Sequence, residues 1–132
     1  MTTVVDASVV VAALVDRGER GAWAEPLAIS EWAVAPQLLP VEVANALRRL
    51  VAAGLVSDDA ASLAHRDLLD LPMGLVEYAS VADRVWELRR TVTAYDACYV
   101  ALAELLDAPL ATLDVRLARA PGLRCQVITR AA

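Results

Sequence analysis

Short apolar runs of strand length alternate along this chain with longer segments of helical periodicity, and this alternation limits the folds that it can adopt. The strand-like runs are 2–6, 33–35, 75–76, 110–113 and 125–129. The helical segments between them are 7–16, about 20–29, 38–53, 58–70, one that follows Ser80, one that follows Thr93, and a short turn at 115–120. Strands joined through helices run parallel, so we expect an α/β fold with a mainly parallel sheet covered on both faces.

Small polar residues mark the points where several of these helices begin. Ser57, Ser80 and Thr93 are the expected N-caps, because their hydroxyls can accept a hydrogen bond from the first helical turn. Asp96 lies three residues after Thr93, where its carboxylate can return that bond as in a capping box. Gly54 is expected to end the helix before it. The apolar stripe of the helix after Thr93 is predicted to consist of Tyr95, Tyr99, Leu102 and Leu106.

The length and apolar content of the chain fit one folded domain. It has 132 residues, of which 58% are hydrophobic and 22% charged, so we expect a single domain over residues 1–132 with one core. The longest apolar run, Val9–Val15, is far shorter than the ~20 residues that a membrane helix needs. No basic residue precedes Arg17, and Asp6 interrupts any signal-peptide core. The sequence therefore predicts a cytoplasmic protein without a membrane segment.

The charged and sulfur-containing residues exclude several classes of site. All 12 basic residues are arginines, which excludes enzymes that need a lysine, such as ordinary P-loop NTPases, Schiff-base enzymes and receiver domains. The net charge of −5 means that a polyanionic substrate would need a metal ion or locally clustered arginines. Cys98 and Cys125 lie 27 residues apart without CxxC spacing, so we expect neither a disulfide nor a zinc site.

Four acidic residues stand at positions that can share one edge of the predicted sheet. Asp6 and Asp114 directly follow two of the best strands, and the carboxyl ends of parallel strands meet at the edge where α/β proteins bind ligands. Glu42 and Asp96 stand in the first turn of helices that would begin near that edge. Each acid alone has an ordinary alternative as a turn, cap or helix-dipole residue. Together they predict an acidic pocket.

An acidic pocket of this kind has a specific chemical use. Two unit charges 4 Å apart repel by about 4 kcal/mol at an effective dielectric near 20, so four carboxylates need a cation. With one histidine and no lysine in the chain, oxygen ligands favour Mg²⁺ or Mn²⁺ over zinc or copper. Such ions bind a phosphodiester, activate water and stabilise the leaving oxygen. The pattern therefore points to metal-dependent nuclease chemistry, which needs no histidine base or covalent nucleophile.

Four segments around these acids resemble the PIN domain family, and specifically its VapC-type ribonuclease toxins of bacterial toxin–antitoxin pairs. The order and spacing of the acids, separated by about 35, 55 and 20 residues, make the combination more specific than any one segment. The segments are Val4-Val-Asp6-Ala-Ser8, Pro40-Val-Glu42-Val-Ala-Asn45-Ala-Leu47, Thr93-Ala-Tyr-Asp96-Ala-Cys-Tyr99-Val-Ala-Leu-Ala103 and Ala111-Thr-Leu-Asp114-Val-Arg-Leu117.

The resemblance implies a three-layer α/β/α fold and an endoribonuclease that uses Mg²⁺ or Mn²⁺. The acids implied to surround the metal are Asp6, Glu42, Asp96 and Asp114, and the polar residues implied to support them are Ser8, Asn45 and Thr112. It also implies RNA as substrate, a cognate VapB-type antitoxin and a homodimer. A catalytically silent PIN-like module that only binds RNA or a protein is the alternative. A haloacid-dehalogenase-type phosphatase is disfavoured, because the segment after Asp6 lacks the second aspartate of D-x-D.

Some surface residues keep two interpretations open. Some relatives carry a further acid after the last one, whereas here Val115 and Arg116 follow, so a second metal ion is expected to bind weakly or only with substrate. Arg116 is a candidate for contact with phosphate, and the adjacent pairs Arg48/Arg49 and Arg89/Arg90 are candidates to flank a groove for single-stranded RNA. Solvated surface positions on the outer faces of helices are the alternative for all of them. Trp23 and Trp32 are equally compatible with the core and with an exposed surface for the antitoxin.

Overall fold

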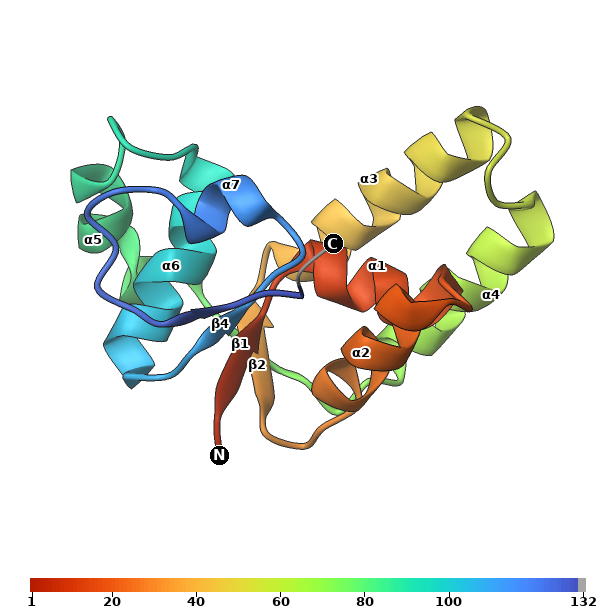
Figure 1. The fold of residues 1–132 in the computed structure, drawn as a ribbon, viewed down its shortest axis with the longest axis horizontal. Coiled ribbons are helices and arrows are strands. Elements are labelled where there is room, and N and C mark those ends of the chain that lie inside the picture. The colour runs from red at the N-terminus through yellow and green to blue at the C-terminus, as the bar shows by residue number, and fades with distance from the viewer. Residues whose placement is uncertain (131–132) are drawn as a thin grey trace.

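A computed structural model describes residues 1–130 as a five-stranded parallel sheet flanked by helices, as predicted (Figure 1). The strands are β1 (Thr3–Val5), β2 (Ala33–Pro36), β3 (Gly74–Val76), β4 (Leu110–Ala111) and β5 (Val127–Ile128). The helices are α1 (Ala7–Val15), α2 (Glu19–Ala28), α3 (Leu39–Ala52), α4 (Asp58–Leu69), the 3₁₀ turn η1 (Tyr78–Ser80), α5 (Ala82–Glu87), α6 (Ala94–Leu106) and α7 (Val115–Ala118).

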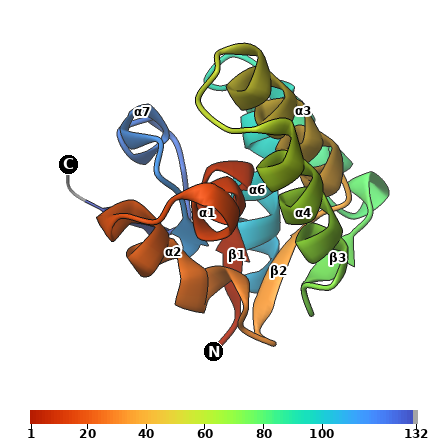
Figure 2. The same ribbon diagram turned by 90° about the vertical axis from the view of Figure 1, so that its right-hand side faces the viewer.

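The helices form a layer on each side of the sheet. Helix α6 packs against β1, β2 and β4 on one face, with α5 beside it. Helices α1 and α2 lie on the opposite face, and α3 and α4 extend beyond α1 as an antiparallel pair (Figures 1 and 2). This is the three-layer α/β/α arrangement expected from the resemblance. No helix in residues 1–130 is long and apolar enough to span a bilayer.

The strand order is β3-β2-β1-β4-β5, so the chain winds outward in both directions from β1. Register is fixed by pairs such as Val4 with Val34 on one side and Val5 with Ala111 on the other. The order reverses between β1 and β4, which makes this the switch point where open α/β sheets leave a crevice outside the strand ends. Asp6 and Asp114 follow the two strands that border it.

The core is built from small and branched aliphatic side chains around α6. Residues 97–103 of α6 are all buried, because both the sheet and α5 cover this helix, and its alanines allow close approach to the strands. Tyr99 and Leu102 belong to this core, as predicted. Tyr95 and Leu106 do not: their side chains are 61% and 41% exposed, because they lie at the two ends of α6, beyond the cover of the sheet.

Most predicted helix boundaries are confirmed. The hydroxyls of Ser57 and Thr93 accept hydrogen bonds from the first turns of α4 and α6, and Gly54 has a φ of 73° at the end of α3. The prediction for Ser80 was wrong. Ser80 is part of η1, where its N–H donates to the carbonyl of Glu77, and α5 begins only after Val81.

Close packing of α1 on α2 depends on one glycine. A Cβ atom at Gly21 would lie 1.7 Å from the carbonyl oxygen of Asp16, so no larger residue fits without moving a helix. The tryptophans that follow differ in exposure. Trp23 is half-buried against the core, whereas Trp32 is 56% exposed, so the core interpretation holds for Trp23 and not for Trp32.

Candidate acidic site

Asp6 lies at the centre of the site and is almost completely buried, with 8% of its surface exposed. It ends β1 and is the N-cap of α1, where its Oδ1 accepts a hydrogen bond from the N–H of Val9 at 3.2 Å. Ser8 also donates to Oδ1 at 2.5 Å, and Thr112 donates to Oδ2. These donors hold the carboxylate in one orientation at the carboxyl end of β1.

The same hydroxyls tie the end of β1 to the segment after β4. The Oγ of Ser8 accepts from the N–H of Leu113 at 3.0 Å, and the Oγ1 of Thr112 accepts from the N–H of Asp114 at 3.0 Å. Each hydroxyl therefore donates to Asp6 and accepts from a backbone N–H of the segment after β4. Ser8 and Thr112 lie where a supporting role for Asp6 requires them, and Asp114 follows within two residues of Thr112.

Glu42 enters the site from the first turn of α3, on the side of β1 away from Asp114. Its Oε1 accepts a hydrogen bond from the hydroxyl of Tyr99 at 2.6 Å. Tyr99 comes from α6 and is itself 2% exposed, whereas Glu42 is half-buried, so this partly buried bond joins α6 to the first turn of α3. A buried phenol needs a partner for its O–H group, and Glu42 supplies it.

Asp96 and Asp114 complete the cluster from α6 and from the segment after β4. Asp96 stands one turn before Tyr99, and its N–H donates to the capping hydroxyl of Thr93 at 3.2 Å. The hydrogen bond that its carboxylate was predicted to return to Thr93 is absent from the contacts of residues 1–130. Asp114 caps α7 by accepting from the N–H of Arg116 at 2.9 Å, and the Nε of Arg116 lies 3.5 Å from the same oxygen.

The electrostatics link the four acids in pairs, with Asp96 coupled to each of the other three. Burial raises the pKa of Asp6, Glu42 and Asp96, because it disfavours their charged forms. The neighbouring acids add to this rise: Asp96 raises the pKa of both Asp6 and Glu42, and Asp114 raises that of Asp96. Hydrogen bonds from Ser8, Thr112 and Tyr99 oppose it. The site therefore holds carboxylates in mutual repulsion, which a cation would relieve.

The donor set of this cluster is made of oxygen atoms. Carboxylates and hydroxyls are hard ligands of the kind that Mg²⁺ and Mn²⁺ prefer, and the residues therefore fit such an ion chemically. In their present rotamers, no three Asp, Glu, His or Cys side chains within residues 1–130 stand close enough to ligate one ion. The acids form an open cluster rather than a closed cage. Cys98 lies near Glu42, but burial and that carboxylate raise the pKa of its thiol.

Asn45 is not among the residues that the structure brings together. It lies on the exposed face of α3, where its side-chain oxygen accepts from the Nε and Nη2 of Arg48 at 3.1 and 3.0 Å. Glu42, Ala46 and Arg49 share the face toward α1, and Asn45 is turned about 100° from Ala46, because consecutive residues of a helix are offset by that angle. Cys98 and Cys125 are free thiols, as predicted.

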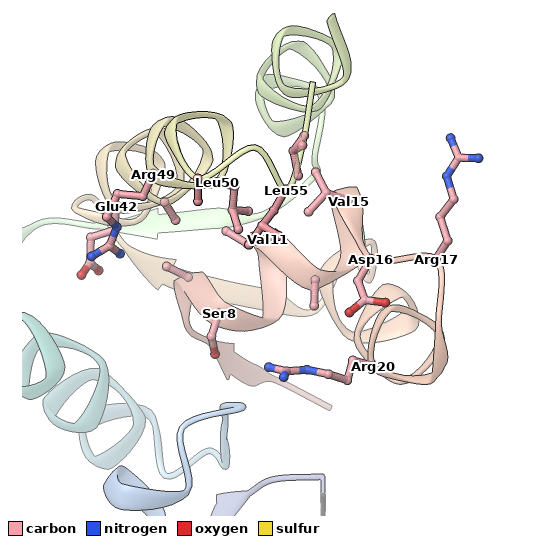
Figure 3. A pocket seen from close by; sticks show the side chains of 15 residues that line it. Ser8, Val11, Val15, Asp16, Arg17, Arg20, Glu42, Arg49, Leu50 and Leu55 are labelled. Atoms are coloured by element: carbon pink, nitrogen blue, oxygen red, sulfur yellow. The ribbon is translucent and has the colours of Figure 1, made fainter. Parts of the chain in front are cut away.

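A groove of about 830 Å³ adjoins the acidic cluster on the side of Glu42. Its walls come from α1, α3 and the start of α2, and its floor is apolar, formed by Val11, Val15, Leu50, Leu55 and Val56 (Figure 3). Arg49 lies beside Glu42 at one end, Arg20 extends toward Ser8, and Arg17 points away. We call this the apolar groove. The groove runs from Leu55 and Arg17 to Ser8 and Glu42 at the acidic cluster.

Two features of the site were missed at the level of sequence. Tyr99 was assigned only to an apolar stripe, although a tyrosine three residues after Asp96 on a buried helix face carries a hydroxyl that needs a partner. Arg20 was not singled out, because nothing in its surroundings indicates that α2 folds back along α1 and directs it toward Ser8.

Comparison with known proteins agrees with this geometry. The family model described as the PIN domain matches residues 3–123. Ribonuclease VapC1 of Mycobacterium tuberculosis is 42% identical over 129 residues, covering 94% of both chains. The structure of PAE2754 from Pyrobaculum aerophilum has a TM-score of 0.70 at 24% identity, covering 96% of this chain and 83% of that one.

A second solved structure has the same fold at lower identity. VapBC2 from Rickettsia felis, bound to a DNA fragment from the promoter, has a TM-score of 0.66 at 15% identity and covers 96% of this chain and 98% of that one. The match to the family model over most of the sequence and the 42% identity to VapC1 are sufficient to assign the family. The chain belongs to the PIN domain family, among its VapC members.

Proposed function

We propose that this protein is a metal-dependent endoribonuclease and the toxin component of a toxin–antitoxin pair. The observation that carries the proposal is the gathering of Asp6, Glu42, Asp96 and Asp114 at the switch point of the sheet. The 42% identity to a ribonuclease, VapC1, supports RNA as the substrate. We also propose that residues 1–132 form a single PIN domain, which the match of the family model to residues 3–123 supports.

The chain's own residues have distinct roles in this proposal. The four acids hold Mg²⁺ or Mn²⁺, and Ser8 and Thr112 keep the Asp6 carboxylate oriented through their hydrogen bonds. When bound, such an ion supplies activation of water and stabilisation of the leaving oxygen of an RNA phosphodiester. The crevice outside β1 and β4 gives the phosphodiester access to Asp6 and Asp114.

A VapB-type antitoxin is the proposed protein partner. The Rickettsia felis neighbour is a VapBC assembly, which supports such a partner for this chain. The apolar groove has the apolar floor that suits a protein segment, and Glu42 is among its lining residues. Arg49 and Arg20 beside it suit an acidic partner side chain. We also expect the protein to be a homodimer and to act in the cytoplasm. Light scattering on the purified protein tests the homodimer.

The test is RNA cleavage by the purified protein with Mg²⁺ or Mn²⁺ and with EDTA. Asp6→Asn and Asp96→Asn are each expected to abolish cleavage and growth arrest, because each removes a charged ligand and keeps the side-chain size. Asn is as good an N-cap as Asp, so Asp6→Asn is expected to keep α1 intact. Asp70→Asn, at an exposed position after α4, is the matched control and should keep full activity.

Calorimetric titration of the metal separates the proposal from the silent binding module. Metal binding together with EDTA-sensitive cleavage supports the nuclease. Metal binding by a folded protein that cleaves no RNA favours the binding module instead. Full cleavage by the double variant Asp6→Asn/Asp96→Asn, with native circular dichroism, would reject the assignment of these acids.

A further inference from the structure

A second pocket borders the acidic cluster on the side away from the apolar groove. It lies between the segment after α5, the start of α6 and α7, and its volume is about 580 Å³, within the range of small-ligand sites. Asp96 and Asp114 stand on its wall, so anything bound there touches the acids. Its other polar lining residues include Arg89, Arg90, Arg116 and Thr93. We call it the arginine pocket.

The arginines of this pocket have charge available for a ligand. Arg89 and Arg90 are exposed and form no ion pair within residues 1–130, in contrast to Arg84, which binds Glu104 at 2.6 Å. Arg116 contacts Asp114 only at 3.5 Å, and its side chain is 91% exposed. Three guanidinium groups around one pocket, in a chain whose net charge is −5, indicate a local site for a polyanion.

An exposed tryptophan outside the pocket lining contacts Arg89, which lines it. Trp86 of α5 is 67% exposed, and the guanidinium carbon of Arg89 lies 4.7 Å from the centre of its ring. The Nη1 of Arg89 also donates to the carbonyl oxygen of Trp86 at 2.7 Å. The ring therefore holds the Arg89 side chain at the pocket and offers a flat aromatic surface next to it.

We propose that the arginine pocket binds the nucleotides of single-stranded RNA that flank the cleaved phosphate, with Arg89 and Arg90 on the phosphates and Trp86 stacked on a base. This inference rests on the proposed ribonuclease function. Basic side chains that follow a backbone, combined with an aromatic face for a base, are how proteins hold single strands. The pocket's position beside Asp96 and Asp114 places the bound strand next to the acids.

The linings of the two cavities beside the acids differ, and the difference favours a protein partner in the apolar groove and RNA in the arginine pocket. The apolar groove has a floor of aliphatic side chains, which suits a protein segment. The arginine pocket instead has three arginines and two threonines among its lining residues, beside two acids and four apolar residues, and these arginines and threonines are hydrogen-bond donors that suit phosphate oxygens. The protein partner and the RNA strand thus approach the acids from opposite sides.

Fluorescence anisotropy of a labelled single-stranded RNA tests the proposal, measured in EDTA so that binding is seen without cleavage. Arg89→Ala and Arg90→Ala are each expected to lower the slope of log K against log salt by about 0.7, the value for one phosphate contact on a single strand. Trp86→Ala is expected to weaken binding roughly 5- to 100-fold, and Trp86→Phe should restore much of it. Arg66→Ala, on the exposed face of α4, is the charge-matched control and should leave both quantities near wild type.

The outcome distinguishes this inference from the function on which it rests. If wild type cleaves RNA with Mg²⁺ but the three variants bind RNA with unchanged affinity and salt slope, the pocket is not an RNA site. If the variants no longer bind the antitoxin but bind RNA as wild type does, the pocket is a site for the protein partner and the inference is overturned. In cleavage assays the supporting result is a raised KM with little change in kcat. Absence of any cleavage by wild type would instead count against the ribonuclease itself.

Discussion

The hydroxyl of Tyr99 on α6 donates a hydrogen bond to Glu42 on α3 at 2.6 Å, which links two helices from opposite sides of the sheet through a partly buried contact. Burial and the neighbouring Glu42 carboxylate together raise the pKa of Tyr99 far above its ordinary value, so the phenol stays protonated and remains a donor. Glu42 therefore enters the acidic cluster with one of its oxygens already oriented.

Tyr99→Phe is expected to weaken Mg²⁺ binding about tenfold, because a hydrogen bond that orients a metal ligand typically contributes 10–100-fold to affinity. Isothermal calorimetry measures the change. Tyr95→Phe is the matched control, since Tyr95 lies on the same helix with its side chain 61% exposed and should bind Mg²⁺ as wild type does. Equal affinities for the two variants would contradict an orienting role for Tyr99.

Glu42→Gln is expected to raise the melting temperature of the metal-free protein by about 1–3 °C at pH 7 and to reduce the further rise caused by Mg²⁺. The pKa of Glu42 is raised in the folded state by burial, with Asp96 and Asp6 adding repulsion, so the folded state binds this proton more tightly than the unfolded state. The stability that this group contributes is therefore fully present below its ordinary pKa of 4.5. It is lost as the pH rises from 4.5 through the raised pKa of the folded state.

Two features of Glu42→Gln make the comparison clean. The amide oxygen of glutamine can still accept from Tyr99, so the change removes charge and keeps the hydrogen bond. Well below pH 4.5 both proteins are neutral at this position in the folded and unfolded states, and differential scanning fluorimetry should find their melting temperatures equal there. A wild-type advantage at pH 7 in EDTA would show that repulsion is not the governing effect.

Glu104→Gln is expected to destabilise the fold by about 2 kcal/mol at pH 7, since it removes a charge-assisted pair with Arg84 at 2.6 Å. Burial raises the pKa of Glu104, but hydrogen bonds from Arg84 and the N–H of Arg124 outweigh it and lower the pKa below 4.5. The stabilisation is therefore present above the ordinary pKa and lost as pH falls through the lowered value.

Urea unfolding at pH 7 and at pH 3 measures this dependence, and the difference between wild type and Glu104→Gln should shrink at the lower pH. Glu87→Gln is the control. Glu87 also contacts Arg84, at 3.3 Å, but its side chain is 59% exposed, so its removal should cost less than ~0.5 kcal/mol. A difference that stays constant between the two pH values would rule out the ionised pair as the cause.

Gly21→Ala is expected to destabilise the protein by about 2–3 kcal/mol, because its Cβ would overlap the carbonyl oxygen of Asp16 and separate α1 from α2. Gly74→Ala offers a matched control in the same chain. A Cβ there would lie 3.4 Å from a methyl group of Val34, an ordinary contact, so a small effect is expected. Chemical denaturation measures both, and similar losses would show that the tight contact at Gly21 is relaxed in solution.

Much of the fold was predictable because it is encoded locally. Hydroxyl caps at Ser57 and Thr93, the left-handed glycine at Gly54 and alternating apolar periods all act within a few residues of one another. The gathering of Asp6 and Asp114 at one edge was also predictable, since neighbouring parallel strands end on the same side of a sheet. Their metal-binding role stays a prediction that the experiments above test.

What could not be predicted depends on contacts between distant segments. The stripe pattern treats Tyr99 as apolar, and only the approach of α3 to α6 shows that its hydroxyl binds Glu42. Ser80 has the chemistry of a cap, but the turn from Glu77 to Val81 takes its N–H and delays the helix. Asn45 lies in a matching motif, yet its rotation about α3 directs it to Arg48 instead of to the acids.

The hydrogen bond from Thr112 to Asp6 joins residues that are 106 positions apart, and this separation bears on when the protein can act. During translation, Asp6 leaves the ribosome long before the segment that carries Thr112 and Asp114 has been made. The nascent chain therefore lacks part of its acidic cluster until Thr112 and Asp114 have emerged. The proposed nuclease activity therefore requires that both segments have left the ribosome and folded together.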